Sequence, residues 1–179
     1  MNNKLLAEII RLNSKKVPFC TVSKIEEDQV EIVPLNHNDK SDIQELNMKA
    51  LDEDKLIVVE YEGNETIINP YNTPLNLIIV GAVHISQYLS KIAKLMDFDV
   101  TIIDPREAFA SKERFPNDKL NNSWPEDCFS ELNIDNRTAI VTLTHEPNLD
   151  DPAITFALKS SCFYIGALGS KKTHKNRIE

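Results

Sequence analysis

The chain has 179 residues, of which 41% are hydrophobic and 27% charged, and its formal net charge is −8. Such a chain is long enough for one full globular domain and a smaller one. An acidic chain without a basic stripe repels nucleic-acid phosphates and anionic lipid, so neither nucleic acid nor membrane is an expected partner. No apolar run approaches the roughly 20 residues of a membrane span.

The cysteines exclude two further classes of protein. Cys20, Cys128 and Cys162 are odd in number, widely spaced and form no C-x-x-C motif. A disulfide framework or a cysteine zinc site is therefore not expected. We predict that each cysteine is a small buried side chain, and that the protein works in the reducing cytoplasm.

The sequence of residues 1–70 predicts a small α+β domain. Segments with apolar residues at helical spacing alternate with segments rich in β-branched residues, which favour strands. In chain order the expected elements are a helix over 1–16, strands over 17–25 and 29–35, a helix within 36–54 capped by Ser41 or Asp39, and a hairpin over 55–69 that turns at Glu62, Gly63 and Asn64.

A linker is predicted at 69–76, where two prolines and three asparagines favour turns. After it, in 71–179, buried-strand and helical patterns alternate. This rhythm predicts an α/β domain with a doubly wound parallel Rossmann-like sheet and right-handed crossovers. The expected strands are 75–80, 99–104, 138–144 and 162–169, and the expected helices are 84–98, 150–160 and 170–179.

Ligands bind such a sheet beyond the carboxyl ends of its strands. Gly81 permits a tight turn there, and the following helix offers free N–H groups to an anion. Asp104 follows Gly81 by 23 residues (104 − 81), the usual place of a ribose-binding acid; it could equally be a turn-forming residue before Pro105. Arg106 could neutralise a phosphate, or pair with Glu107 or Asp104.

Two later strand ends carry further candidates. His145, after Thr144, is a possible ligand-facing donor or general base, or a residue that only binds its own loop. Asp150 and Asp151 precede Pro152 and are predicted to cap a helix that starts there. The segment GALGSKK, residues 166–172, could wrap a phosphate with backbone amides and lysine charge, or be a glycine turn beside a solvated basic face.

Four stretches resemble motifs of the XdhC/CoxI family in order and spacing: GAVHIS, VTIIDPREAFASKERFP, VTLTHEPNLDD and YIGALGSKKTHKNRIE. The resemblance covers Leu77 to Glu179. It implies the Rossmann domain of an accessory protein for molybdenum hydroxylases such as xanthine dehydrogenase. Such proteins bind the molybdenum cofactor (molybdopterin, a pterin with a phosphate and often a nucleotide). They help to have it sulfurated and inserted into the apoenzyme.

The resemblance implies a function and a set of contacts for this chain. We predict a chaperone that binds the molybdenum cofactor, with the hydroxylase apoenzyme and a sulfurtransferase as partners. No catalytic residue and no metal site are assigned. The predicted cofactor-binding residues are Gly81, His84, Asp104, Arg106, Thr144, His145, Gly166, Gly169, Ser170 and Lys171.

The chain departs from the family pattern in three places. Val83 stands where the family has the second glycine of GAGH, and residues 1–70 lack its glycine-rich, cysteine-bearing segment. Family domains also continue past the position of Glu179, so we expect an exposed sheet edge and a homodimer. Two alternatives stay open: an NAD(P)-binding oxidoreductase, and a degenerate domain that binds only a protein partner.

Overall fold

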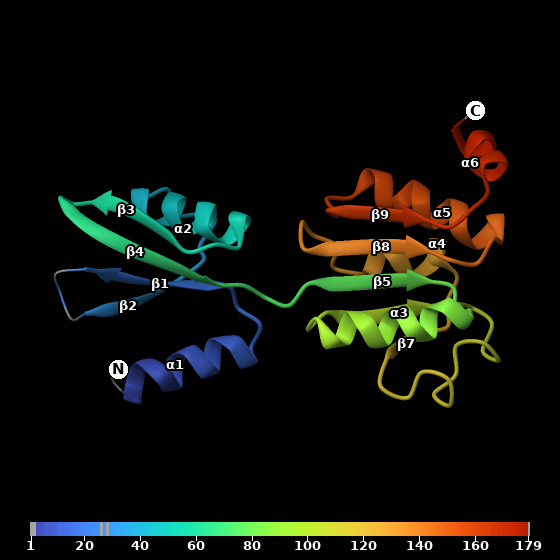
Figure 1. Cartoon of the computed structure of the whole chain (residues 1–179), viewed down its shortest axis with the longest axis horizontal. Helices are drawn as coiled ribbons and strands as arrows, with labels where there is room; N and C mark the ends of the chain where they lie inside the picture. The colour runs from blue at the N-terminus through green and yellow to red at the C-terminus, as the bar shows by residue number, and fades with distance from the viewer. Residues whose placement is uncertain (1–2, 26, 28, 179) are drawn as a thin grey trace. The chain divides into compact units, whose positions relative to one another are not determined.

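The computed structural model of the chain describes residues 3–25, 27 and 29–178. The chain divides into two compact units, Met1–Thr73 and Pro74–Glu179. In Figure 1 the first unit runs from blue to green and the second from green to red. Every helix in the described part of the chain is too short or too polar to span a bilayer.

The N-terminal unit is an antiparallel sheet of four strands in the order β2-β1-β4-β3. Helix α2 packs on one face of this sheet, where its Ala50 and Leu51 meet Cys20 and Ile68. In chain order the elements are α1 (Asn3–Ser14), β1 (Phe19–Lys24), β2 (Val30–Pro34), α2 (Asp42–Glu53), β3 (Ile57–Tyr61) and β4 (Asn64–Tyr71).

The hairpin predicted in this unit forms, whereas the predicted side-chain cap of Ser41 does not. Strands β3 and β4 pair through a two-residue turn, with φ of 51° at Glu62 and 75° at Gly63. Positive φ at both positions is typical of a type I′ hairpin turn. Helix α2 begins after Ser41, whose own side chain makes no capping bond; the Ser41 N–H instead donates to Asp39 Oδ1 at 2.9 Å.

The C-terminal unit is a parallel sheet of five strands in the order β7-β6-β5-β8-β9, which confirms the doubly wound Rossmann-like fold. The chain moves from β5 to β6 in one direction and then crosses to β8 on the other side, so the switch point lies beside β5. The elements are β5 (Asn76–Val80), α3 (His84–Leu95), β6 (Asp99–Ile103), β7 (Lys119–Asn121), α4 (Pro125–Cys128), η1 (Phe129–Glu131), β8 (Thr138–Thr142), α5 (Pro147–Lys159), β9 (Tyr164–Ala167) and α6 (Lys171–Ile178).

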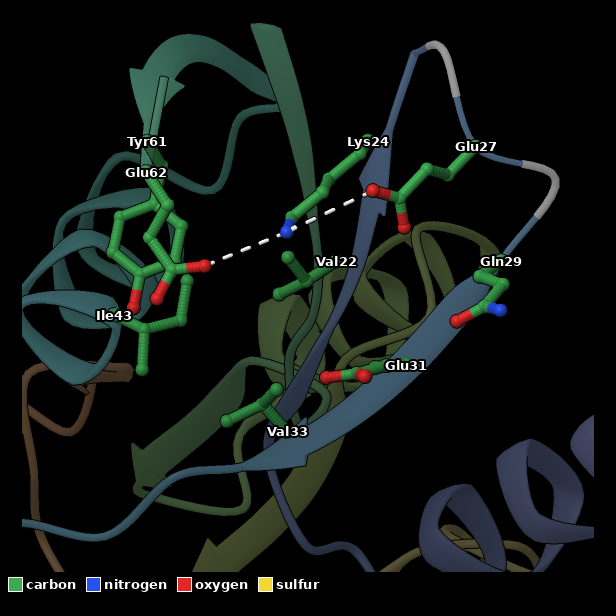
Figure 2. Close-up of a pocket in the computed structure, with 9 residues that line it drawn as sticks. All are labelled: Val22, Lys24, Glu27, Gln29, Glu31, Val33, Ile43, Tyr61 and Glu62. Carbon is green, nitrogen blue, oxygen red and sulfur yellow. Dashed lines mark hydrogen bonds and ion pairs between the residues drawn. The ribbon is translucent and has the colours of Figure 1, made fainter. Parts of the chain in front are cut away.

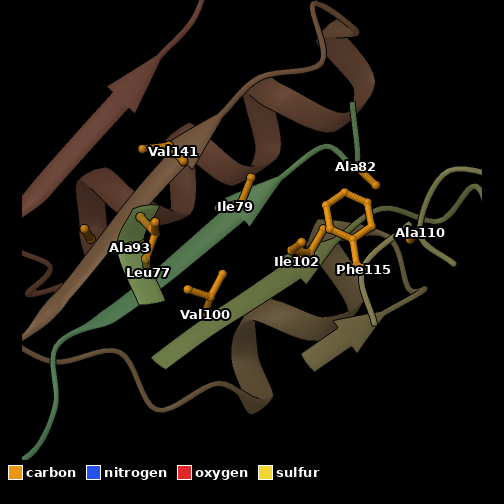
Figure 3. Packing of buried hydrophobic residues seen from close by; sticks show 10 residues of the cluster. Leu77, Ile79, Ala82, Ala93, Val100, Ile102, Ala110, Phe115 and Val141 are labelled. Atoms are coloured by element: carbon orange, nitrogen blue, oxygen red, sulfur yellow. The ribbon is translucent and has the colours of Figure 1, made fainter. Parts of the chain in front are cut away.

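Both faces of the parallel sheet are covered, which explains the continuous apolar run of β5. Its alternate residues enter two different clusters, because successive side chains of a strand point to opposite faces. Leu77 and Ile79 pack on the α3 side with Ala93, as Figure 3 shows, together with Phe115 from the long β6–β7 connection. The other face packs against α5, through Ala153 and its neighbours.

The structure corrects the predicted start of α5. The helix begins at Pro147, with Glu146 as its N-cap, so Pro152 lies inside the helix and not at its first position. Asp150 and Asp151 are therefore helical residues, and the prediction that they are N-caps is wrong. Pro147 suits the first position, whose N–H has no partner within a helix, whereas Pro152 in the second turn leaves the Asn148 carbonyl without a helical N–H donor.

The region between β6 and β8 holds elements that no sequence pattern predicted: the short edge strand β7, α4 and η1. The cysteine prediction is confirmed for Cys20 and Cys128, which are buried, while Cys162 is only half-buried. All three are free thiols. Burial raises the pKa of Cys20 to about 11.

Candidate ligand-binding site at the strand ends

The first candidate loop is the turn from β5 into α3. Gly81 has φ 107°, a conformation that L-residues rarely adopt, and a Cβ there would overlap Thr144 Cγ2. Val83, by contrast, is the N-cap of α3 with φ −82°. The turn therefore needs one glycine and not two. No side chain caps the start of α3, so its first N–H groups remain available to an anion.

Asp104, at the end of β6, is fully buried beside this turn. Its carboxylate accepts hydrogen bonds from the Ala82 N–H (2.8 Å) and the Arg106 N–H (3.0 Å), and two from the Arg106 guanidinium (2.8 Å each). Burial alone would raise the pKa of Asp104, but these bonds outweigh it and hold the pKa below its ordinary value. Asp104 thus holds the loop and presents no exposed oxygen to a ligand.

Arg106 and His84 lie on the exposed side of the same loops. The Arg106 side chain keeps 34% of its surface exposed while it pairs with Asp104, and its guanidinium stacks 4.5 Å from the Phe109 ring centre. His84 is exposed at the first position of α3, edge-on to Tyr88 with ring centres 5.1 Å apart. Both residues can therefore reach a ligand above the switch point.

The loop after β8 is organised by Asp150. This fully buried carboxylate accepts hydrogen bonds from Thr144 Oγ1 (2.7 Å), the Thr144 N–H (3.4 Å) and the His145 N–H (3.1 Å). His145 has φ 65°, the left-handed region, and its side chain is exposed. Sequence reasoning named His145 but missed the partner that holds it, because Asp150 resembled an ordinary cap.

The GALGSKK segment divides between a strand and a helix cap. Gly166 lies inside β9, where a Cβ would come within 2.9 Å of the Tyr164 ring and 3.1 Å of Val141, so its role in the fold is close packing. Ser170 Oγ accepts from the Thr173 N–H at 3.1 Å, which caps the start of α6. Gly169 and the exposed Lys171 are the members of this segment at the strand end.

The structure brings the predicted residues to one edge of the sheet, at the strand arrowheads in Figure 1. Gly81 and Thr144 are in direct contact, which joins the β5 and β8 loops. A cavity of about 360 Å³ lies between the β8–α5 loop and α6. Its lining residues are His145, Pro147, Asp151, Lys172, Thr173 and Arg177.

Figure 2 shows a separate cavity of about 240 Å³ in the N-terminal unit. Lys24 Nζ lies 3.4 Å from Glu62 Oε2 and 4.0 Å from Glu27 Oε1, and Glu31 also lines the cavity. Three carboxylates against one ammonium disfavour a phosphate-bearing ligand there. Within the described ranges, no group of three or more His, Cys, Asp or Glu residues is placed to hold a metal ion.

The chain matches a protein family, and the proteins similar to it include a curated chaperone and a solved structure. The family model described as the XdhC Rossmann domain matches residues 77–179. The molybdenum cofactor insertion chaperone PaoD of Escherichia coli (strain K12) is 41% identical over 46 residues, which are 26% of this chain and 14% of that protein. The crystal structure of a xanthine dehydrogenase from Bacillus halodurans superposes with a TM-score of 0.71 at 20% identity, over 98% of this chain and 53% of that one. The chain thus covers about half the length of the structural relative, and its matched segment covers about a seventh of the chaperone.

Proposed function

The chain belongs to the XdhC Rossmann domain family, and from this membership we propose that it is an accessory protein of a molybdenum hydroxylase. In this proposal it binds the molybdenum cofactor and assists its maturation and insertion into the apoenzyme. The similarity to a molybdenum cofactor insertion chaperone supports the role. The three free cysteines suit a reducing cytoplasm as the place of action.

One structural observation carries the proposal: exposed cationic and imidazole groups lie on the loops that follow the carboxyl ends of the parallel strands, where α3 also begins without a side-chain cap. His84, His145 and Lys171 are exposed there, and Arg106 is partly so. A ligand with a phosphate and a heteroaromatic ring needs an anion-binding helix start, nearby positive charge and polar side chains. The residues present fit that chemistry, and they would hold the phosphate and the pterin of the cofactor.

The geometry counts against the NAD(P) alternative. A dinucleotide site needs an acid that accepts hydrogen bonds from the ribose hydroxyls. Asp104 occupies that sequence position but is fully buried, and it already accepts four hydrogen bonds from its own loops. Val83 adds a side chain at the place where a pyrophosphate would approach the backbone.

Partners remain part of the proposal. We propose the hydroxylase apoenzyme as recipient, a sulfurtransferase as a second partner, and a homodimer. Among the described residues β9 pairs with β8 on one side and has no strand on the other. Phe163, Tyr164 and Leu168 are exposed along this edge, and such an edge favours association. Light scattering on the purified chain tests the homodimer, and a monomeric mass at micromolar concentration would rule it out.

Binding of molybdopterin to the purified full chain tests the main proposal. Ultrafiltration followed by oxidation and pterin fluorescence gives the bound fraction, and we expect saturable binding. Lys171→Glu reverses a charge at the strand edge and should weaken binding by about tenfold, the effect of about 1.4 kcal/mol. Lys159→Glu makes the same charge change in the last turn of α5, near the amino ends of the strands. This variant should leave binding unchanged.

Two results would contradict the proposal. Absence of saturable binding by the wild-type chain would remove the cofactor-binding function. Equal losses in Lys171→Glu and Lys159→Glu would mean that overall charge governs binding, and the ligand would then have no defined place at the strand edge.

A further inference from the structure

His145 adopts a backbone conformation that histidine does not choose by itself. Its φ of 65° lies in the left-handed region, where the Cβ of an L-residue crowds the following carbonyl oxygen. Residues keep such conformations only where the surrounding structure fixes them, and they cluster at functional sites. Contacts from neighbouring residues must therefore hold His145 in this conformation.

Asp150 supplies the fixing contacts from the first turn of α5. Its Oδ2 accepts from the His145 N–H at 3.1 Å, and its Oδ1 accepts from Thr144 Oγ1 at 2.7 Å. Thr144 Oγ1 in turn accepts from the Glu146 N–H at 2.9 Å. The Asp150 carboxylate thus holds three successive N–H groups of the loop. It accepts directly from the N–H groups of Thr144 and His145, and it holds the Glu146 N–H through the Thr144 hydroxyl.

Arg177 joins this network from α6. Its Nη2 lies 3.3 Å from Asp150 Oδ2, and its Nε donates to Asp151 Oδ1 at 2.8 Å. Arg177 offsets the buried charge of Asp150 and fixes α6 to the start of α5. His145 and Arg177 both line the 360 Å³ cavity, so the network sets the shape of that cavity from two sides.

We infer that Asp150 is a positioning residue, which holds the His145 imidazole toward the ligand and is itself secured by Arg177. Asp150 is fully buried and cannot touch the ligand, so its effect on binding passes through His145. The inference rests on the proposed function only for the identity of that ligand. The geometry of the loop is a property of the free protein.

The test compares Asp150→Asn with Asp151→Asn. Asp151 is the adjacent residue, has a half-exposed side chain and an ion pair to the same arginine, and makes no hydrogen bond to the His145 loop among the described residues. NMR of the ligand-free full chain follows the amide and imidazole resonances of His145. We expect Asp150→Asn to shift both sets of resonances, and Asp151→Asn to shift the His145 amide resonance far less, because the His145 N–H donates to Asp150 and not to Asp151.

Molybdopterin binding adds a double-mutant cycle with His145→Ala. Asp150→Asn should weaken binding by about tenfold in the wild-type background and have little further effect once His145 is absent, as for coupled residues of one network. A merely structural role of Asp150 would give the same loss in both backgrounds, and that result would overturn the inference. Unshifted His145 resonances in Asp150→Asn would overturn it as well.

The two proposals fail in different ways. If the wild-type chain does not bind molybdopterin but Asp150→Asn still shifts the His145 resonances, the proposed function is lost and the positioning role stands. Thermal unfolding first checks that each variant folds. If Asp150→Asn does not fold, Thr144→Val takes its place in the same measurements, since it removes the hydroxyl between Asp150 and the Glu146 N–H.

Discussion

Replacing Gly81 by alanine tests the contact between the β5 and β8 loops. The new Cβ would stand on a backbone with φ 107°, and it would overlap Thr144 Cγ2 with Thr144 N only 3.2 Å away. A strained backbone of this kind costs about 1–3 kcal/mol, and overpacking costs about 1–3 kcal/mol more. The expected loss of about 2–6 kcal/mol is large against the roughly 5–15 kcal/mol that stabilise a domain.

Variants at two other glycines distinguish the cost of backbone strain from the cost of overpacking. Gly63 has φ 75° but open space around it, so Gly63→Ala should cost only the backbone strain, about 1–2 kcal/mol. At Gly169 φ lies outside the left-handed region and a Cβ would meet Thr173 at an ordinary 3.4 Å. Gly169→Ala should therefore change the free energy of unfolding by less than about 1 kcal/mol in either direction.

Urea unfolding followed by circular dichroism measures all three variants at neutral pH. The order of loss should be Gly81→Ala first, Gly63→Ala second and Gly169→Ala last. A Gly81→Ala variant as stable as Gly169→Ala would refute the reasoning, because Thr144 would then have to move aside at no cost. The two loops would be independent, and the site could not be treated as one preorganised unit.

Two further predictions concern buried groups. Because hydrogen bonds hold the folded-state pKa of Asp104 below its ordinary 3.8, their stabilisation is present above that pH and is lost as the pH falls through the folded pKa. Asp104→Asn should therefore cost about 2 kcal/mol at neutral pH, and progressively less as the pH falls below 3.8 toward the folded-state pKa. A cost in urea unfolding that does not fall over this acidic range would contradict the prediction. In the folded chain, the half-buried Cys162 should react with an aromatic disulfide reagent well before the buried Cys20 and Cys128, whose thiol pKa values burial raises; equal rates for all three would contradict it.

Sequence reasoning found the features that depend on local patterns. The apolar run of β5, the glycine after it and the hairpin turn at Gly63 each follow from a few neighbouring residues. Strand β7 has three residues, Lys119–Asn121, too few for any periodicity to show. The start of α5 was misplaced because both Pro147 and Pro152 are candidates for the first helical position, and the structure places Pro147 there.

The roles of the two buried aspartates could be read from the sequence only in part. For Asp104 a ribose contact and a turn before Pro105 were both open; the Arg106 N–H bond fits the turn, but the burial of Asp104 depends on a bond to Ala82, 22 residues away in the chain. Asp150 depends on Arg177, 27 residues away in helix α6. Such pairings follow from the packed fold and leave no local pattern.

Asp104 and Asp150 play the same structural role in the loops after β6 and β8, the two strands that flank β5. Each buries a carboxylate, captures backbone N–H groups of a loop with it, and balances its charge with one arginine. A carboxylate buried without such partners would be strongly destabilising, so each loop conformation and its arginine stabilise one another. The loops are thereby fixed before any ligand arrives, which lowers the entropy cost of binding.

The hydrogen bonds of Asp104 also explain why the chain tolerates Val83 where the family has a second glycine. The bond from the Ala82 N–H to Asp104 and the φ of Gly81 fix the turn, while Val83 sits in an ordinary extended conformation. A glycine at this position would therefore serve the ligand and not the backbone. The valine leaves the fold of the loop intact and changes only the space above the start of α3, where a ligand would approach.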